Sequence, residues 1–70
     1  MNVTTFKIEG EHIELIQLLK AIGLAQTGGH AKMMVDDGLV KRNGESEIRK
    51  RAKLVRGEEI NVLGTIIRLI

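Results

Sequence analysis

Five basic side chains crowd into eight residues near the middle of this chain. The stretch GESEIRKRAKLVRGEEI contains Arg49, Lys50, Arg51, Lys53 and Arg56. A guanidinium group can bind two phosphate oxygens at once and an ammonium group acts as a point charge, so this cluster has the chemistry to bind a polyanion. Runs of charge are also common on ordinary solvated faces. Residue types alone leave both interpretations open.

The distribution of charge makes the same stretch a basic pole. The 70-residue chain has a formal net charge of +2; residues 1–40 contribute −2, residues 41–56 contribute +5 and residues 57–70 contribute −1. Such a field attracts nucleic acid or an anionic membrane surface without selecting a sequence. Arg49 and Arg51 are the best candidates for phosphate, because the guanidinium fork is bidentate.

Enzymatic chemistry has little support in the residue types. The histidines are His12 and His30, and the sequence contains no cysteine or tyrosine. Asp36 and Asp37 fall at a predicted helix end, and no nucleophile, base and orienting group can be assembled. No ligand cluster has metal-site spacing. We therefore expect no enzyme activity, no metal and no cofactor.

The aromatic content narrows the kinds of nucleic acid that could bind. Phe6 is the only aromatic residue, so the stacking platforms that hold splayed single-stranded bases cannot be built. Recognition would depend on shape and backbone charge, which favours folded RNA.

Other residues could extend a basic surface. Lys32 could contact RNA or simply pair with Asp36 at i+4. Lys41 and Arg42 should point to opposite faces of their strand, so at most one faces the cluster. A helix start at Thr27, Gly28 and Gly29 could bind phosphate, with His30 beside it, although an ordinary helix cap is the commoner case. The full candidate set is His30, Lys32, Lys41, Arg42, Arg49, Lys50, Arg51 and Lys53, with Thr27, Gly28 and Gly29.

Two short helices should precede a sheet. A first helix is predicted in EHIELIQLLKAIGLA, where Leu15, Leu18, Leu19 and Ile22 form one stripe and Gly23 ends the helix. Ile13 and Ile16 lie off that stripe and should meet another element. A second helix should run from an N-cap at Thr27 to Gly38. Helices joined by so few residues should pack as a hairpin.

Strand signals surround the helices. Residues 5–8 could form an edge strand before the first helix. Asn43-Gly44 suits a type I′ turn, RGEE and LG separate further short runs, and TIIRLI is rich in β-branched residues. The segment from Ile48 to Val55 is ambiguous. As a strand it groups Ile48, Ala52 and Leu54 on one side and Arg49, Arg51 and Lys53 on the other; as a helix it aligns Ile48, Ala52 and Val55.

The order of these features, over roughly residues 12–62, resembles the S4 RNA-binding domain, also called the αL motif. The elements that match are Leu19, Gly23-Leu24, Thr27-Gly28, Ala31-Lys32, Met34-Val35, Gly38-Leu39-Val40, Asn43-Gly44, Arg49 to Arg51 and Gly57-Glu58-Glu59-Ile60. The chain is similar to small stand-alone bacterial proteins of this family. The resemblance implies binding to structured RNA, with ribosomal RNA as the expected target and tRNA-like RNA as another.

The sequence also departs from the family pattern. The usual arginine at the start of the second helix falls on Gly28, the opening Arg-Leu-Asp falls near Glu14-Leu15-Ile16, and the second hairpin valine becomes Arg42. Where many members have Lys-Pro-Ser, this chain has Arg49-Lys50-Arg51, which adds charge in the region that faces RNA in the family.

These observations together predict one α+β domain spanning residues 1–70, with a helical hairpin followed by a small, mostly antiparallel β-sheet. We expect a cytoplasmic, monomeric RNA-binding protein that takes part in ribosome assembly or translation. No signal peptide or membrane span is predicted. The alternatives are a protein-interaction module that docks an acidic partner, and a subunit that gives RNA affinity to a modifying enzyme.

Overall fold

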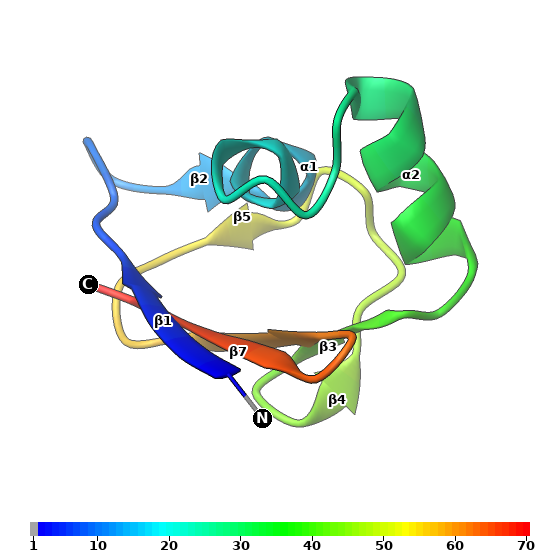
Figure 1. Cartoon of the computed structure of the whole chain (residues 1–70). Coiled ribbons are helices and arrows are strands. Elements are labelled where there is room, and N and C mark those ends of the chain that lie inside the picture. The colour runs from blue at the N-terminus through cyan, green and yellow to red at the C-terminus, as the bar shows by residue number, and fades with distance from the viewer. Residues whose placement is uncertain (1) are drawn as a thin grey trace.

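The computed structural model describes residues 2–70, so Met1, the first residue of the predicted domain, lies outside the described part. Two helices and seven strands are present in those residues (Figure 1). Their bounds are β1 Asn2–Phe6, β2 Ile13–Glu14, α1 Leu15–Ala21, α2 Gly28–Asp36, β3 Val40–Arg42, β4 Glu45–Ser46, β5 Lys53–Leu54, β6 Glu59–Val62 and β7 Thr65–Leu69.

The strands form two sheets. The larger has the order β1-β7-β6-β3-β4, and β1 pairs with β7 in parallel whereas the other neighbours are antiparallel. The smaller is the antiparallel pair β2-β5. The predicted α+β class with a mostly antiparallel sheet is therefore confirmed. The opening strand is at the sheet edge, as predicted, but spans Asn2–Phe6 rather than residues 5–8.

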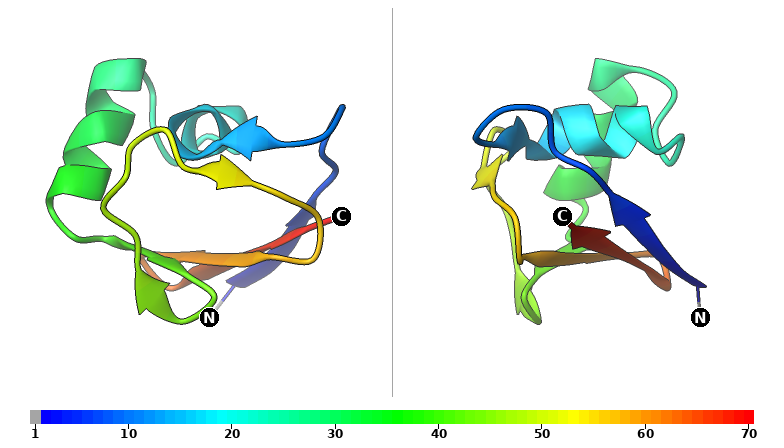
Figure 2. Two further views of the ribbon diagram at one scale, coloured as in Figure 1. Left: turned by 180° about the vertical axis from the view of Figure 1, so that it is seen from behind. Right: turned by 90° about the vertical axis from the view of Figure 1, so that its left-hand side faces the viewer.

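Both helices and the β2-β5 pair lie on one side of the five-stranded sheet (Figures 1 and 2). The core fills the space between these two layers. Leu15, Leu18 and Leu19 of α1 are fully buried, as are Ile60 and Ile67 of the sheet. Each such side chain stabilises the fold by about 1.5–3 kcal/mol relative to an exposed one.

Helix α1 confirms the predicted stripe but begins later than predicted. Residues 11–14 do not join the helix because Ile13 and Glu14 pair with β5, and the next backbone N–H, of Leu15, donates to the Ala52 carbonyl at 3.0 Å. Ile13 thus meets another element, as expected for a residue off the stripe. Gly23, at φ +81°, follows the helix end.

Helix α2 begins where the sequence predicts. The Thr27 hydroxyl accepts a hydrogen bond from the backbone N–H of His30 at 3.0 Å, which confirms the N-cap. The helix ends at Asp36, and Gly38 follows at φ +74°. Ala31, Met34 and Val35 form the buried face.

Two hairpins of the large sheet use two-residue loops. Asn43 and Gly44 have φ of 51° and 87°, as the predicted type I′ turn requires. Leu63 and Gly64 connect β6 to β7 with φ of 51° and 81°. Leucine rarely adopts a positive φ because its Cβ crowds the backbone, so the second turn works against its residue type.

Neither interpretation of the segment from Ile48 to Val55 was right. Residues 47–49 are irregular, a turn covers residues 50 and 51, and only Lys53 and Leu54 form a strand. Ile48 is 75% exposed, so it does not share the buried side with Ala52 and Leu54. The backbone bends here because Ala52 and Lys50 direct their carbonyls to the start of α1.

The turn at Leu63 predicts a stabilising substitution. Leu63→Asn should raise the free energy of unfolding by about 0.5–1 kcal/mol, since Asn tolerates a positive φ and Leu63, 66% exposed, contributes little burial. Thermal unfolding would show a rise of several degrees. Leu39→Asn, also at an exposed position but without a positive φ, should not stabilise; equal gains from both variants would contradict this account.

Candidate functional site

The loop that joins β4 to β5 holds the basic cluster and is fixed to both helices. The Ile16 N–H donates to the Lys50 carbonyl at 3.3 Å, close to the contact between Leu15 and Ala52. Lys50 Nζ also forms a 3.2 Å ion pair with Asp36 Oδ1 at the end of α2. The loop therefore has a defined path although it lacks regular secondary structure (Figure 2).

This path brings four of the predicted basic residues together. Arg49, Arg51 and Lys53 of the basic segment line one open pocket of about 520 Å³, together with Arg42 and Ala52. Lys50 instead points to Asp36. The side chain that shares a surface with Arg49 is thus that of Arg51, as the strand interpretation had it, although the segment is not a strand.

Arg42 differs from the other basic residues because the protein uses most of its donors internally. Its Nε and Nη2 donate to the two carboxylate oxygens of Glu58 at 2.6 and 2.8 Å. Nη2 also donates to the Lys53 carbonyl at 3.0 Å, and Nη1 donates to Glu47 Oε1 at 3.2 Å. These bonds occupy four of the five N–H groups. With a side chain only 22% exposed, Arg42 is placed as an internal ion-pair partner, not as a displayed charge.

Glu47 is the buried charged residue among the described residues, at 6% exposure. It bonds to Arg42 on one side and to Arg49 on the other. The Arg49 backbone N–H and Nε donate to Oε2 at 3.1 and 3.2 Å, and Nη2 donates to Oε1 at 3.3 Å. A carboxylate is tolerated at this depth because two guanidinium groups and a backbone N–H surround it.

The ion pairs shift the proton affinities of both partners. Hydrogen bonds from Arg49, and next from Arg42, lower the pKa of Glu47 to about 2, against the opposing effect of burial. The carboxylate of Glu58, followed by that of Glu47, raises the pKa of Arg42 above its ordinary value. Glu47 and Arg42 are therefore both charged at neutral pH.

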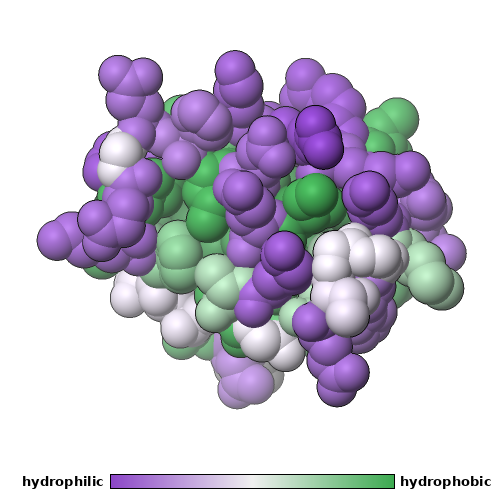
Figure 3. All heavy atoms as spheres, turned by 90° about the horizontal axis from the view of Figure 1, so that it is seen from above, coloured by the Kyte–Doolittle hydropathy of each residue, from purple (hydrophilic) through white to green (hydrophobic). Residues whose placement is uncertain are grey.

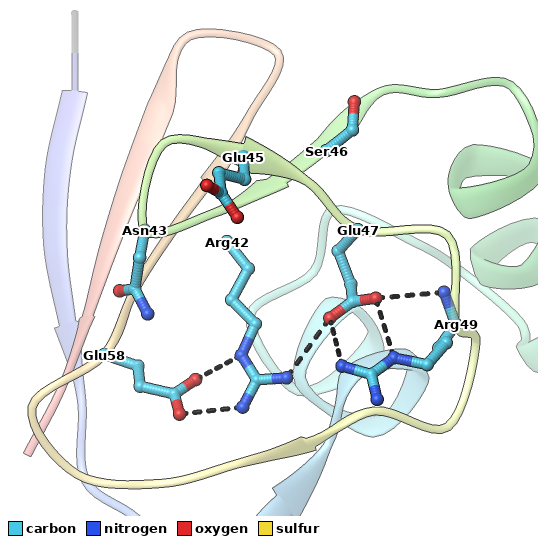
Figure 4. A pocket seen from close by; sticks show the side chains of 7 residues that line it. All are labelled: Arg42, Asn43, Glu45, Ser46, Glu47, Arg49 and Glu58. Carbon is cyan, nitrogen blue, oxygen red and sulfur yellow. Dashed lines mark hydrogen bonds and ion pairs between the residues drawn. The ribbon is translucent and has the colours of Figure 1, made fainter.

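A second open pocket, of about 490 Å³, adjoins the first one (Figure 4). Arg42 and Arg49 line both pockets. Figure 4 shows the guanidinium of Arg42 between the carboxylates of Glu58 and Glu47, with Arg49 on the far side of Glu47. This second pocket is lined by Arg42, Asn43, Glu45, Ser46, Glu47, Arg49 and Glu58.

Lys41 lies apart from the cluster. Along β3, Val40 is buried, Lys41 is exposed and Arg42 is partly buried, so Lys41 and Arg42 point to opposite faces of the sheet as predicted. Because Arg42 is on the side of the pockets, Lys41 projects from the other face.

Of the two interpretations left open for Lys32, the ion pair with Asp36 is not formed. Asp36 pairs with Lys50 of the loop, and Lys32 forms no ion pair within residues 2–70. Lys32 is exposed and lies one turn before Asp36 on the same side of α2. It is therefore available as a charge on the helix face next to the loop.

The start of α2 is used as a helix cap. Thr27 caps the backbone N–H of His30, and the His30 ring accepts at Nδ1 from the backbone N–H of Gln26 at 3.2 Å. Space around Gly28 and Gly29 is open. At 1.5 Å per residue, this helix start is about 12 Å from Asp36, so it forms a separate point on the surface.

Sequence reasoning missed Glu47 and Glu58 as parts of the site. Each acid lies close to the basic segment in the chain, and this proximity is a signal that a carboxylate neutralises one of the cations. The partner could not be identified from spacing, because Arg42 reaches Glu58 across 16 residues.

No group of three or more potential metal ligands occurs in the described part of the chain. Among residues 2–70, no helix has the length and apolar character to cross a bilayer.

Comparison with known proteins supplies relatives for this arrangement. Residues 6–70 match the S4 domain family. YbcJ of Escherichia coli (strain K12) and YbcJ of Shigella flexneri are each 37% identical over 59 residues, 84% of both chains. The solution structure of E. coli YbcJ, described as having an αL motif involved in RNA binding, superposes with a TM-score of 0.74 at 35% identity, over 100% of this chain and 90% of that one.

Removal of Arg42 should destabilise the fold. Arg42→Ala leaves the carboxylates of Glu47 and Glu58 without their shared cation, and should lower the free energy of unfolding by about 2–4 kcal/mol in urea denaturation. Arg51→Ala removes the same charge from an exposed position and should change the free energy of unfolding by less than about 0.5 kcal/mol. Similar small effects for both would show that the Arg42 network is not structural.

The low pKa of Glu47 predicts loss of stability in acid. In the unfolded chain Glu47 takes up a proton near its ordinary pKa of 4.5, whereas in the folded protein it stays ionised to about 2. Its contribution is therefore complete above about pH 5 and is lost as the pH falls toward 2, by at most about 3 kcal/mol. Glu47→Gln should flatten this part of the pH–stability curve measured by urea denaturation; a curve that keeps the wild-type slope in this variant would contradict the account.

Proposed function

This chain belongs to the S4 domain family, and on that premise we propose that it binds folded RNA, without catalysis, through its basic loop. The observation that supports this most is the convergence of Arg49, Arg51 and Lys53 around one open pocket. Three cations brought to one pocket by a loop of defined path suit the fixed spacing of phosphates in a folded RNA. The solution structure of E. coli YbcJ, which is described as having an αL motif involved in RNA binding, supports the same activity.

The environment of Phe6 supports folded RNA over single strands. Phe6 is the only aromatic residue in the sequence, and it packs against the core. No second Phe, Tyr or Trp side chain is present to build a stacking platform for unpaired bases. Contacts to phosphates and to the shape of a helix or loop are then the available mode of recognition.

The RNA-contact set in this proposal is smaller than the set of basic residues. Arg49, Arg51 and Lys53 form its centre, with Lys32 and Lys50 at the side facing α2. Thr27, Gly28, Gly29 and His30 form a second phosphate contact at the start of α2. Arg42 acts by holding the loop, and Lys41 contacts RNA only where the RNA wraps around the sheet.

We further propose ribosomal RNA as the target, with tRNA-like structures as the alternative, and a role in ribosome assembly or translation for a cytoplasmic monomer. This follows from the family resemblance and from recognition by shape and charge.

The rival function is docking of an acidic protein partner. The face over the helices has mainly hydrophilic side chains, with apolar ones in small separate groups (Figure 3). A protein interface usually has an apolar centre, so this view of the face gives no support to a protein partner.

Binding can be tested with purified ribosomal RNA as the probe and poly(U) as the unstructured comparison. We expect affinity for ribosomal RNA to fall steeply with salt and to exceed affinity for poly(U). Arg51→Ala combined with Lys53→Ala should weaken binding roughly tenfold or more and reduce the salt slope by about 1.5. Arg49 stays in place in this variant because it also bonds Glu47.

The control is Lys7→Ala combined with Lys20→Ala, which removes the same charge from exposed positions outside both pockets. It should retain most of the affinity. A flat salt response, equal losses in the two double variants, or competition by an acidic peptide instead of RNA would contradict RNA binding at this surface.

A further inference from the structure

We propose that Glu47 is a positioning residue for RNA binding. Its carboxylate holds the side edge of the Arg49 guanidinium, formed by Nε and Nη2. The end edge, formed by Nη1 and Nη2, then faces the phosphate. This inference rests on the proposed function. It means that an acidic residue within the basic surface increases affinity for a polyanion, which is the opposite of its effect as a charge.

The donor atoms of Arg49 define the two edges. Nε and one N–H of Nη2 form the side edge, and both donate to the carboxylate of Glu47. The two N–H groups of Nη1 and the second one of Nη2 remain. One from each nitrogen forms the end edge, which can bind two phosphate oxygens. The side chain is 72% exposed, so this edge is accessible to RNA.

The same carboxylate also fixes the backbone below that side chain. Glu47 Oε2 accepts from the Arg49 backbone N–H at 3.1 Å as well as from Nε. Both ends of the Arg49 side chain are thus bonded to one group. A long flexible side chain held in this way loses less conformational freedom when it binds a phosphate.

Glu47 is itself held in place by the remainder of the network. Arg42 donates to Glu47 and, through two parallel bonds, to Glu58 at the turn before β6. Arg42 also donates to the carbonyl of Lys53, the residue that follows the loop. The order Glu58, Arg42, Glu47, Arg49 therefore leads from the framework of the sheet to the RNA surface (Figure 4).

The chain contains a matched control for this proposal. Glu45 lines the same pocket, is exposed, and lies two residues from Glu47. Glu45→Gln and Glu47→Gln make the same change of charge in nearly the same place. If these acids act only as charges, both variants should bind RNA more tightly.

The positioning role predicts opposite signs. Glu47→Gln should weaken binding to ribosomal RNA about three- to tenfold although the net charge rises by one, and should reduce the salt slope by up to about 1 as the Arg49 contact is lost. Glu45→Gln should leave binding unchanged or tighten it. In an Arg49→Ala background, Glu47→Gln should no longer weaken binding, because its effect passes through Arg49.

The proposal is overturned if folded Glu47→Gln binds ribosomal RNA as tightly as Glu45→Gln does. That result differs from failure of the proposed function, which would appear as wild-type protein that shows no salt-dependent binding or as Arg51→Ala/Lys53→Ala protein that binds normally.

A second measurement needs no variant and decides the matter if Glu47→Gln does not fold. In the free wild-type protein, nitrogen relaxation at arginine Nε should show Arg49 to be ordered and the exposed Arg51 to be mobile. Equal mobility of the two Nε–H groups would overturn the proposal.

Discussion

The basic surface around Arg49 depends on the ion pairs of one buried carboxylate, that of Glu47. An ionised group at 6% exposure must be surrounded by donors, and here Arg42 and Arg49 provide them from opposite sides. Arg42 is neutralised further by Glu58 and faces inward, whereas Arg49 keeps a free edge. The network thus gives its two arginines different roles: Arg42 is structural, whereas Arg49 is exposed to solvent. It also fixes the loop between them.

Local sequence signals were sufficient for much of the fold. The leucine stripe of α1, the Thr27 cap and the Asn43-Gly44 turn each depend on neighbouring residues, so spacing predicts them. The predicted start of α1 was wrong because the backbones of Ile13 and Glu14 pair with β5, about 40 residues later in the chain. The path of the loop after Glu47 could not be predicted for the same reason, since contacts with the two helices decide it.

The candidate site could be proposed from the sequence as a basic region, but its contacts could not. Charge counting placed the basic pole correctly in the sequence, and the structure brings Arg49 and Arg51 together at one pocket. Which cations are displayed depends on long-range pairs: Arg42 with Glu58, and Lys50 with Asp36. The short-range i,i+4 rule offered Lys32 as one possible partner of Asp36. Composition therefore identified the basic region, the family resemblance indicated RNA, and tertiary pairing decides which of the charges remain exposed.

The most direct test of this division is a titration of the wild-type protein with ribosomal RNA fragments, followed by NMR of the arginine side chains. Our account predicts that the guanidinium signals of Arg49 and Arg51 shift or broaden with the first additions, and that the signal of Arg42, whose donors stay with Glu58 and Glu47, does not. A dominant response of Arg42, or no response of Arg49 and Arg51 while RNA binds, would contradict it.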